Sequence, residues 1–176
     1  NPQLIALGET GLDYYHSTQF KEKQLEIFES HIEASKIFDL PIIIHQRDSE
    51  RDIIEVLKKF NNDKLKIVFH CFTGSKNLLE FCLENNYYIS LSGIVTFKNA
   101  VNLRDVILNA SLEYLLVETD SPFLAPVPMR GKINEPSYVK FTAEYLAKFY
   151  SMTLEEFSQL TDNNFYKLFS KAKKDN

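Results

Sequence analysis

The chain has 176 residues, of which 44% are hydrophobic and 25% are charged, as is usual for one globular domain. No apolar run approaches the roughly 20 residues that a membrane-spanning helix needs, and the first residues resemble neither a signal peptide nor a transit peptide. The formal net charge of −4 argues against a protein that binds nucleic acid through a broad basic surface, so a polyanion would need a local attractor such as a metal ion.

Short apolar runs rich in β-branched residues alternate along the chain with longer segments of helical periodicity. The predicted strands are Leu4–Gly8, Pro41–His45, Lys66–His70, Tyr87–Leu91 and Tyr114–Glu118. Helices are predicted over Gln19–Phe38, from Ser49, from Ser75, and over Asn99–Ile107, Ser137–Phe149, Leu154–Leu160 and Asp162–Lys171. Thr153 and Glu156 predict a capping box for the helix that begins at Leu154.

Continuous apolar strands separated by helices are typical of a parallel sheet that is covered on both faces. We therefore expect an α/β fold with one domain over residues 1–176. Five β/α units fit either an open doubly wound sheet or the larger part of a (β/α)₈ TIM-type barrel, which typically has about 250 residues. The pattern alone leaves both architectures open.

Four side chains of metal-ligand type lie at the ends of predicted strands. Glu9 follows the first strand, His45 and His70 end the second and third, and Asp120 lies just past the fifth. Parallel strands bring their carboxyl ends to one rim, where the sites of barrels and open α/β sheets are assembled. Each residue alone is explained by a turn, a helix cap or a half-buried histidine, but four at one rim predict a shared metal site.

Two imidazoles and two carboxylates suit a divalent cation such as Zn²⁺, Mn²⁺ or Mg²⁺ rather than a soft thiolate site. Cys71 follows His70 directly, and adjacent strand residues point to opposite faces, so we do not expect its sulfur at the centre. His16 and His31 lack a place at a strand end, and we expect both to be structural. With Cys82, Cys71 makes no disulfide framework, which indicates reduced thiols and a cytoplasmic protein.

Six motifs run along nearly the whole chain: "GETGLDYY", "LPIIIHQRDS", "VFHCFTGS", "YISLSGI", "LLVETDSPFLAPVPMRGKINEP" and "LTDNNFYKLF". In this order they resemble the TatD family of metal-dependent deoxyribonucleases, which is similar to the amidohydrolase-type (β/α)₈ barrels. The resemblance implies a TIM-type barrel, of which the chain carries about the last five β/α units. The family begins with a His-x-His strand that does not occur here, so we expect one TatD-like metallohydrolase domain truncated at its N-terminus.

The resemblance also implies roles for the four rim residues. Glu9 would bridge two divalent ions, His45 and His70 would bind one of them, and Asp120 would bind the other. Asp120 would also orient or deprotonate the attacking water, which makes Glu9 and Asp120 the expected catalytic residues. The expected cofactors are two divalent metal ions in the complete protein.

These roles predict a phosphodiester hydrolase, a deoxyribonuclease of the 3′–5′ exonuclease type, that uses metal-activated water and takes DNA, or RNA, as its substrate. Arg47 and Arg130 are candidate phosphate contacts because a guanidinium matches phosphate geometry. A salt bridge to a nearby carboxylate, such as Asp48 or Glu135, is the alternative for each arginine.

Two other functions stay open at this point. One is a metal-dependent amidohydrolase that acts on C–N or ester bonds with the same rim, although that class often has a lysine where Glu9 stands. The other is an inactive partial barrel.

Overall fold

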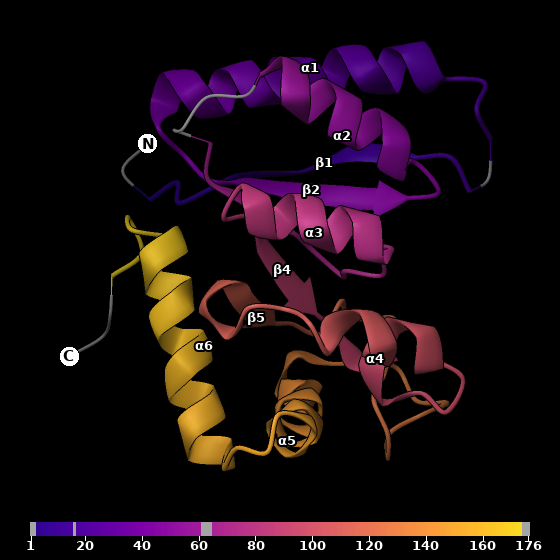
Figure 1. The fold of residues 1–176 in the computed structure, drawn as a ribbon, viewed down its shortest axis with the longest axis vertical. Coiled ribbons are helices and arrows are strands. Elements are labelled where there is room, and N and C mark those ends of the chain that lie inside the picture. The colour runs from indigo at the N-terminus through magenta and orange to yellow at the C-terminus, as the bar shows by residue number, and fades with distance from the viewer. Residues whose placement is uncertain (1–2, 16, 61–64, 174–176) are drawn as a thin grey trace. The chain divides into compact units, whose positions relative to one another are not determined.

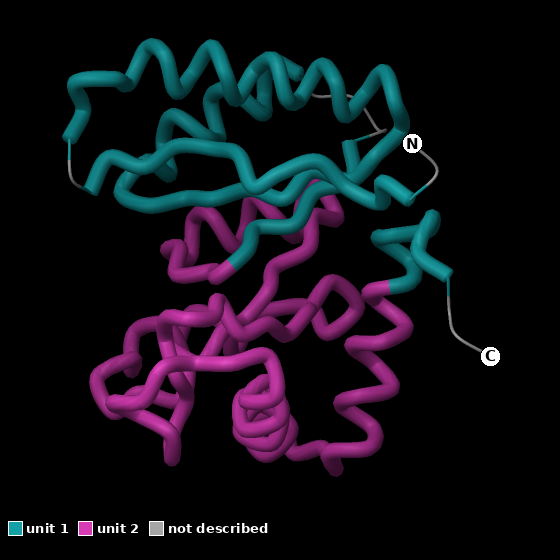
Figure 2. Tube along the Cα trace, turned by 180° about the vertical axis from the view of Figure 1, so that it is seen from behind, with its two compact units in different colours: residues 1–70, 166–176 teal, residues 71–165 magenta. Residues whose placement is uncertain are grey.

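The computed structural model describes residues 3–15, 17–60 and 65–173. The chain forms two compact units, one of residues 1–70 with 166–176 and one of residues 71–165 (Figure 2). His16, which was predicted to be structural, lies outside the described residues. No helix in the described ranges combines the length and the apolar character needed to cross a membrane.

The first unit is built on three parallel strands, β1 (Leu7–Asp13), β2 (Ile42–Arg47) and β3 (Ile67–Phe69), with β2 paired to both of the others. Figure 1 shows β1 and β2 side by side. Helix α1 (Lys21–Phe38) connects β1 to β2, and helix α2 (Glu50–Lys59) follows β2. The alternation of parallel strands and helices that the sequence predicted is confirmed here.

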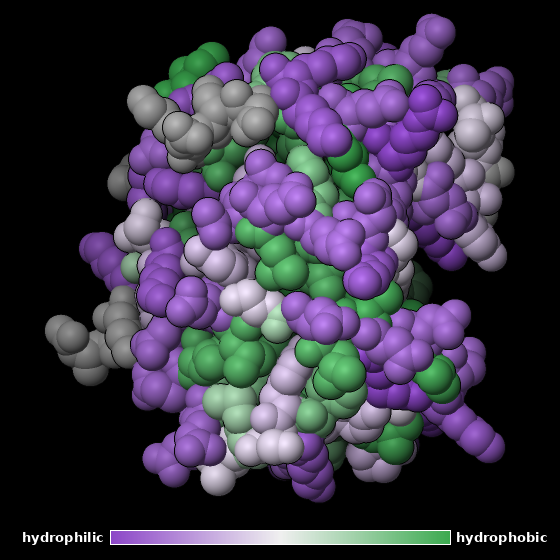
Figure 3. All heavy atoms as spheres, in the orientation of Figure 1, coloured by the Kyte–Doolittle hydropathy of each residue, from purple (hydrophilic) through white to green (hydrophobic). Residues whose placement is uncertain are grey.

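Helix α1 buries one stripe of side chains, with Phe28 and Ile32 fully enclosed. Hydrophilic residues cover much of the visible surface over α1 and α2 (Figure 3), which is the amphipathic pattern expected of helices that cover a sheet. Helix α2 begins after Ser49 as predicted. The Ser49 hydroxyl does not cap the helix, however, but donates a hydrogen bond of 2.6 Å to the carbonyl of Leu12 and so ties α2 to β1.

The second unit contains the parallel strands β4 (Tyr88–Leu91) and β5 (Leu115–Val117), paired in register from Ile89 opposite Leu115. Its α-helices are α3 (Lys76–Glu84), α4 (Val101–Ile107), α5 (Val139–Phe149) and, as far as Phe165, α6 (Leu154–Leu168). Short 3₁₀ helices lie at η1 (Gly93–Thr96), η2 (Leu112–Tyr114) and η3 (Pro136–Tyr138). Together the two units confirm the predicted α/β class with five strands.

Two predicted caps are confirmed and one predicted helix break is wrong. The Ser75 hydroxyl accepts from the main-chain N–H groups at the start of α3, and Thr153 and Glu156 form the reciprocal hydrogen bonds of a capping box. The two helices predicted over Leu154–Leu160 and Asp162–Lys171 are one continuous helix, α6. The Thr161 hydroxyl bonds back to the carbonyl of Phe157, so this polar residue is accommodated within the helix instead of ending it.

The first strand differs from its prediction, because β1 covers Leu7–Asp13 and not Leu4–Gly8. Leu7 pairs with Ile42 and Thr10 pairs with Ile44, so between these two pairs β1 has one more residue than β2. Such a bulge re-aims a side chain and bends the strand. Glu9 therefore lies within a strand, in the bulge, rather than after the strand's end.

Two glycines allow β1 to run this close to β2. Gly8 and Gly11 have φ angles of +137° and +143°, which side-chain-bearing residues rarely adopt. A Cβ atom at Gly11 would lie 2.0 Å from the carbonyl oxygen of His45, and one at Gly8 would lie 2.7 Å from that of Ile43. The contact of β1 with β2 therefore requires glycine at both positions.

Substitution of Gly11→Ala should lower the free energy of unfolding by at least about 3 kcal/mol, because the added methyl group meets a backbone carbonyl that cannot move aside. Gly131→Ala is the matched control, since Gly131 also has a positive φ, +85°, but nothing lies within 4 Å of its added Cβ. That control should cost about 1 kcal/mol, for the backbone conformation alone. Urea unfolding followed by circular dichroism measures both, and equal costs for the two variants would contradict the close approach.

Candidate metal centre

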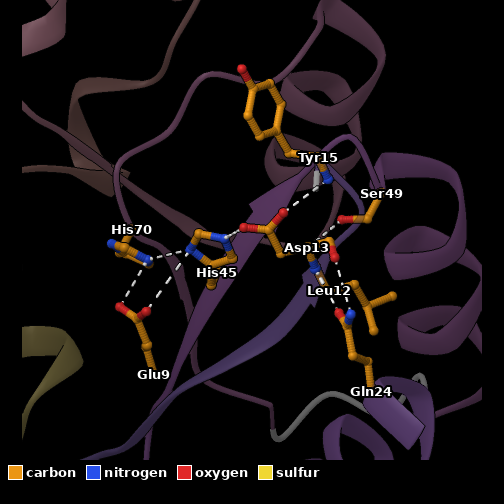
Figure 4. A network of polar contacts seen from close by, with 8 residues as sticks. All are labelled: Glu9, Leu12, Asp13, Tyr15, Gln24, His45, Ser49 and His70. Carbon is orange, nitrogen blue, oxygen red and sulfur yellow. Dashed lines mark hydrogen bonds and ion pairs between the residues drawn. The ribbon is translucent and has the colours of Figure 1, made fainter. Parts of the chain in front are cut away.

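Glu9, His45 and His70 come together within the first unit (Figure 4). His70 Nε2 lies 3.1 Å from Glu9 Oε2 and 3.2 Å from His45 Nδ1, and His45 Nδ1 lies 4.0 Å from Glu9 Oε1. One donor atom from each residue thus lies within 4.8 Å of the others, a spacing that could hold a metal ion. Three of the four predicted ligands are neighbours, although their role as ligands stays a prediction.

The order of the strands explains this meeting. His45 is near the carboxyl end of β2, and His70 directly follows β3, where its N–H continues the ladder by donating to the carbonyl of Ile44. The bulge in β1 presents the Glu9 side chain toward both imidazoles (Figure 4). Parallel neighbours therefore deliver one donor each to the same edge of the sheet.

The three side chains differ in exposure, from 12% for His70 through 31% for His45 to 59% for Glu9. The group is therefore enclosed on the His70 side and open on the Glu9 side. An open side is what a catalytic metal site needs, because a water or substrate must occupy a coordination position that the protein leaves unfilled.

Asp13, which the sequence reasoning missed, completes the polar network around His45. Its Oδ2 lies 3.0 Å from His45 Nε2, on the side of the ring away from the other two candidate ligands (Figure 4). Burial acts to raise the pKa of the Asp13 carboxyl, but hydrogen bonds from the Tyr15 N–H and from His45, together with the nearby charge of Arg47, bring the pKa below its ordinary value. Asp13 is therefore a carboxylate at neutral pH.

A longer first strand would have revealed Asp13 in the sequence. Thr10 and Leu12 are buried, so the alternation of a strand places the side chain of Asp13 on the opposite face. Because the predicted strand ended at Gly8, Asp13 lay outside it and this alternation was not considered.

Asp120 belongs to the second unit, three residues after β5, and has a positive φ of +56°. It lies beside the thiol of Cys71, whose main-chain N–H donates 2.9 Å to Glu118 Oε1. Its predicted roles as metal ligand and base remain predictions. Glu118, which the sequence analysis did not select, shares this corner of the unit.

The Cys71 thiol is held in its neutral form. Burial raises its pKa to about 12, with the negative charges of Asp120 and Glu118 acting in the same direction and a hydrogen bond with Ser92 opposing them. Cys71 and Cys82 are not joined in a disulfide. That Cys71 takes no part in the centre stays a prediction.

The two candidate phosphate-binding arginines each stack on an aromatic ring. The guanidinium carbon of Arg47 lies 3.5 Å from the centre of the Tyr15 ring in the first unit. That of Arg130 lies 3.7 Å from the centre of the Phe97 ring in the second unit. His31, predicted to be structural, lies on α1 with its Nδ1 2.8 Å from the carbonyl of Ile27.

A family model described as TatD related DNase matches residues 1–170. The chain is 44% identical over 167 residues to the uncharacterized metal-dependent hydrolase YabD of Bacillus subtilis, covering 95% of this chain and 66% of that relative. It is 45% identical over 166 residues to the uncharacterized metal-dependent hydrolase YcfH of Escherichia coli K12, covering 94% and 63%. The chain thus spans about two thirds of the length of these curated relatives.

Solved structures resemble the chain as well. The crystal structure of YJJV, a TatD homolog from Escherichia coli, matches with a TM-score of 0.87 at 30% identity, over 95% of this chain and 64% of that one. A hydrolase of the TatD family from Entamoeba histolytica matches with a TM-score of 0.81 at 24% identity, over 97% and 64%, and supports the fold alone. The fold is therefore that of TatD homologs. The resemblance of the sequence to this family implies a TIM-type barrel.

Chemical labelling tests the state of Cys71. A pKa of about 12 leaves roughly one thiol in 10⁴ ionised at pH 8, so iodoacetamide should modify Cys71 at least about 100-fold more slowly than in the urea-unfolded chain. Peptide mass spectrometry separates Cys71 from Cys82, which is also buried. Labelling of native Cys71 as fast as in the unfolded chain would contradict the assignment.

Proposed function

Because the chain belongs to the TatD related DNase family, we propose that it is a metal-dependent phosphodiester hydrolase that acts on DNA. The observation that carries the proposal is the meeting of Glu9, His45 and His70 at one edge of the first unit's sheet. The names of the relatives support metal-dependent hydrolysis, and the description of the family model supports DNA as the substrate.

The donor set fits a divalent ion. Two imidazoles and a carboxylate are ligands that Zn²⁺ and Mn²⁺ accept, and the oxygen of Glu9 also suits Mg²⁺. His45 and His70 would hold one ion through Nδ1 and Nε2, the atoms that face Glu9. Both oxygens of Glu9 point toward the histidines, and its exposed side chain leaves it able to serve a second ion in the complete protein.

The chemistry that such an ion supplies when bound is a lowered pKa for its water ligand, toward about 7, and neutralisation of charge on the phosphate. For Asp120 we propose the role that the resemblance to the family implies, that of a base that accepts a proton from the attacking water. Glu9, His45 and His70 would fix the position of the water relative to the phosphate through their hold on the site.

The arginines would contribute to substrate binding. The guanidinium groups of Arg47 and Arg130 lie over the rings of Tyr15 and Phe97, and a guanidinium in such a contact keeps N–H groups in its own plane that can meet another partner. These donors could then meet a phosphate while the stacking holds the side chain in place. With a net charge of −4, the chain would depend on such local positive groups and on the metal to attract DNA. We also propose a cytoplasmic location, with which two cysteines outside any disulfide agree.

Removal of one candidate ligand tests the metal site. His70→Ala should weaken Zn²⁺ or Mn²⁺ binding by at least about 100-fold in isothermal titration calorimetry, because it removes the most enclosed donor of the group. His31→Ala is the matched control, since it removes an imidazole of the same unit that lies on α1. Equal affinity in the His70 and His31 variants would refute the site.

In a full-length version that includes the His-x-His strand, Asp120→Asn should lower the rate of DNA hydrolysis with divalent metal by more than about 100-fold, since an amide cannot accept the proton of the water. The control is Asp162→Asn, which removes an exposed carboxylate from α6 of the same chain.

DNA, RNA, nucleotide esters and cyclic amides assayed side by side would separate a nuclease from a C–N hydrolase. Undiminished hydrolysis by the Asp120 variant would overturn its assignment as the base, and absence of hydrolysis of every phosphodiester would overturn the proposed reaction.

A further inference from the structure

His45 has polar partners on both sides of its ring. Nδ1 faces His70 and Glu9 at 3.2 and 4.0 Å, whereas Nε2 faces Asp13 Oδ2 at 3.0 Å (Figure 4). A neutral imidazole carries one proton, on one of its two nitrogens. The side on which that proton lies decides whether Nδ1 can offer a lone pair to an ion.

We infer that Asp13 is a positioning residue, which accepts the Nε2–H of His45 and thereby presents the Nδ1 lone pair of that ring to the metal centre. The inference rests on the proposed metal-binding function, and it adds a residue with no contact to the ion itself. An ionised carboxylate can only accept hydrogen bonds, so its contact with Nε2 places the ring proton there. The same contact fixes the rotation of the ring, because a flipped ring would turn Nδ1 away from Glu9.

Asp13 is itself held in place by two neighbours. Its Oδ1 accepts the N–H of Tyr15 at 2.9 Å, so each of its oxygens has a separate donor. The side-chain amide of Gln24, from α1, bonds both the N–H and the carbonyl of Asp13, at 2.8 and 3.0 Å (Figure 4). A chain of hydrogen bonds thus runs from α1 through Asp13 to His45.

A carboxylate behind a metal-binding histidine has a known physical effect. It fixes the tautomer and the orientation of the ring and raises the basicity of the ligand nitrogen, and its loss typically costs 10–100-fold in metal affinity. The geometry around His45 meets the requirement for this effect, since the carboxylate and the candidate ligands lie on opposite nitrogens of one ring.

Asp13→Asn is the sharpest variant because it keeps the size of the side chain. It replaces one accepting oxygen with an NH₂ group, so the N–H of Tyr15 and the Nε2–H of His45 can no longer both be accepted. Asp52→Asn is the matched control in the same unit. The Asp52 carboxylate also has two donors, the Tyr14 hydroxyl and the Lys21 ammonium group, and neither is a candidate metal ligand.

The first measurement uses the metal-free full chain. In the ¹⁵N spectrum of the imidazoles, His45 should carry its proton on Nε2 and none on Nδ1 in the wild-type protein. This pattern should persist in Asp52→Asn and be lost or averaged in Asp13→Asn. A merely structural Asp13 would lower the melting temperature of its variant without changing the His45 signals.

The second measurement is calorimetric titration with Zn²⁺. Asp13→Asn should lose about 10–100-fold in affinity, whereas Asp52→Asn should bind as the wild type does. A wild-type His45 protonated on Nδ1, or wild-type Zn²⁺ affinity in Asp13→Asn, would overturn the inference. Failure of the proposed function gives a different result, because the wild-type chain would then bind no Zn²⁺ while the spectrum of His45 still decides the role of Asp13.

Discussion

The close contact between β1 and β2 is the constraint on which the candidate centre depends. Gly8 and Gly11 allow the two backbones to approach to a distance that a Cβ atom would block. The extra residue of β1 in this stretch forms the bulge that turns Glu9 toward the imidazoles of His45 and His70. With a regular first strand, the carboxylate and the two histidines would not share an edge in the same way.

Around the candidate metal ligands, further polar side chains form successive shells of hydrogen bonds. The candidate ligands form the inner layer, Asp13 supports His45 from behind, and Gln24 connects Asp13 to α1. Ser49 adds a link between α2 and the carbonyl of Leu12, in the same strand as Asp13. Helices that bury an apolar face on the sheet thus also fix the polar side chains at its edge, which is how a rigid scaffold positions a site.

Much of the fold could be predicted from the chain because the local signals were strong. The apolar runs identified all five strands, and the caps at Ser75 and Thr153 marked helix starts through their own side-chain chemistry. The predicted bounds of the first strand were wrong because its bulged pairing with β2 overrides local preference, whereas the error in the C-terminal helix has a local cause. Thr161 reads as a break in the C-terminal helix, yet its hydroxyl bonds the preceding turn, and α6 continues to Leu168.

By itself, the sequence determined the α/β class and the family, and it placed His45 and His70 near the carboxyl ends of parallel strands, because strand periodicity and residue chemistry are local properties. The tertiary structure decided that β1 continues to Asp13, that the Glu9 carboxylate turns inward from a bulge, and that Asp13 stands behind His45. These features depend on the pairing of one strand with another and on the close approach of two backbones. Glycine allows that approach, but a glycine in the sequence does not by itself predict it. Residues far apart in the chain acquire a shared chemistry only through that pairing.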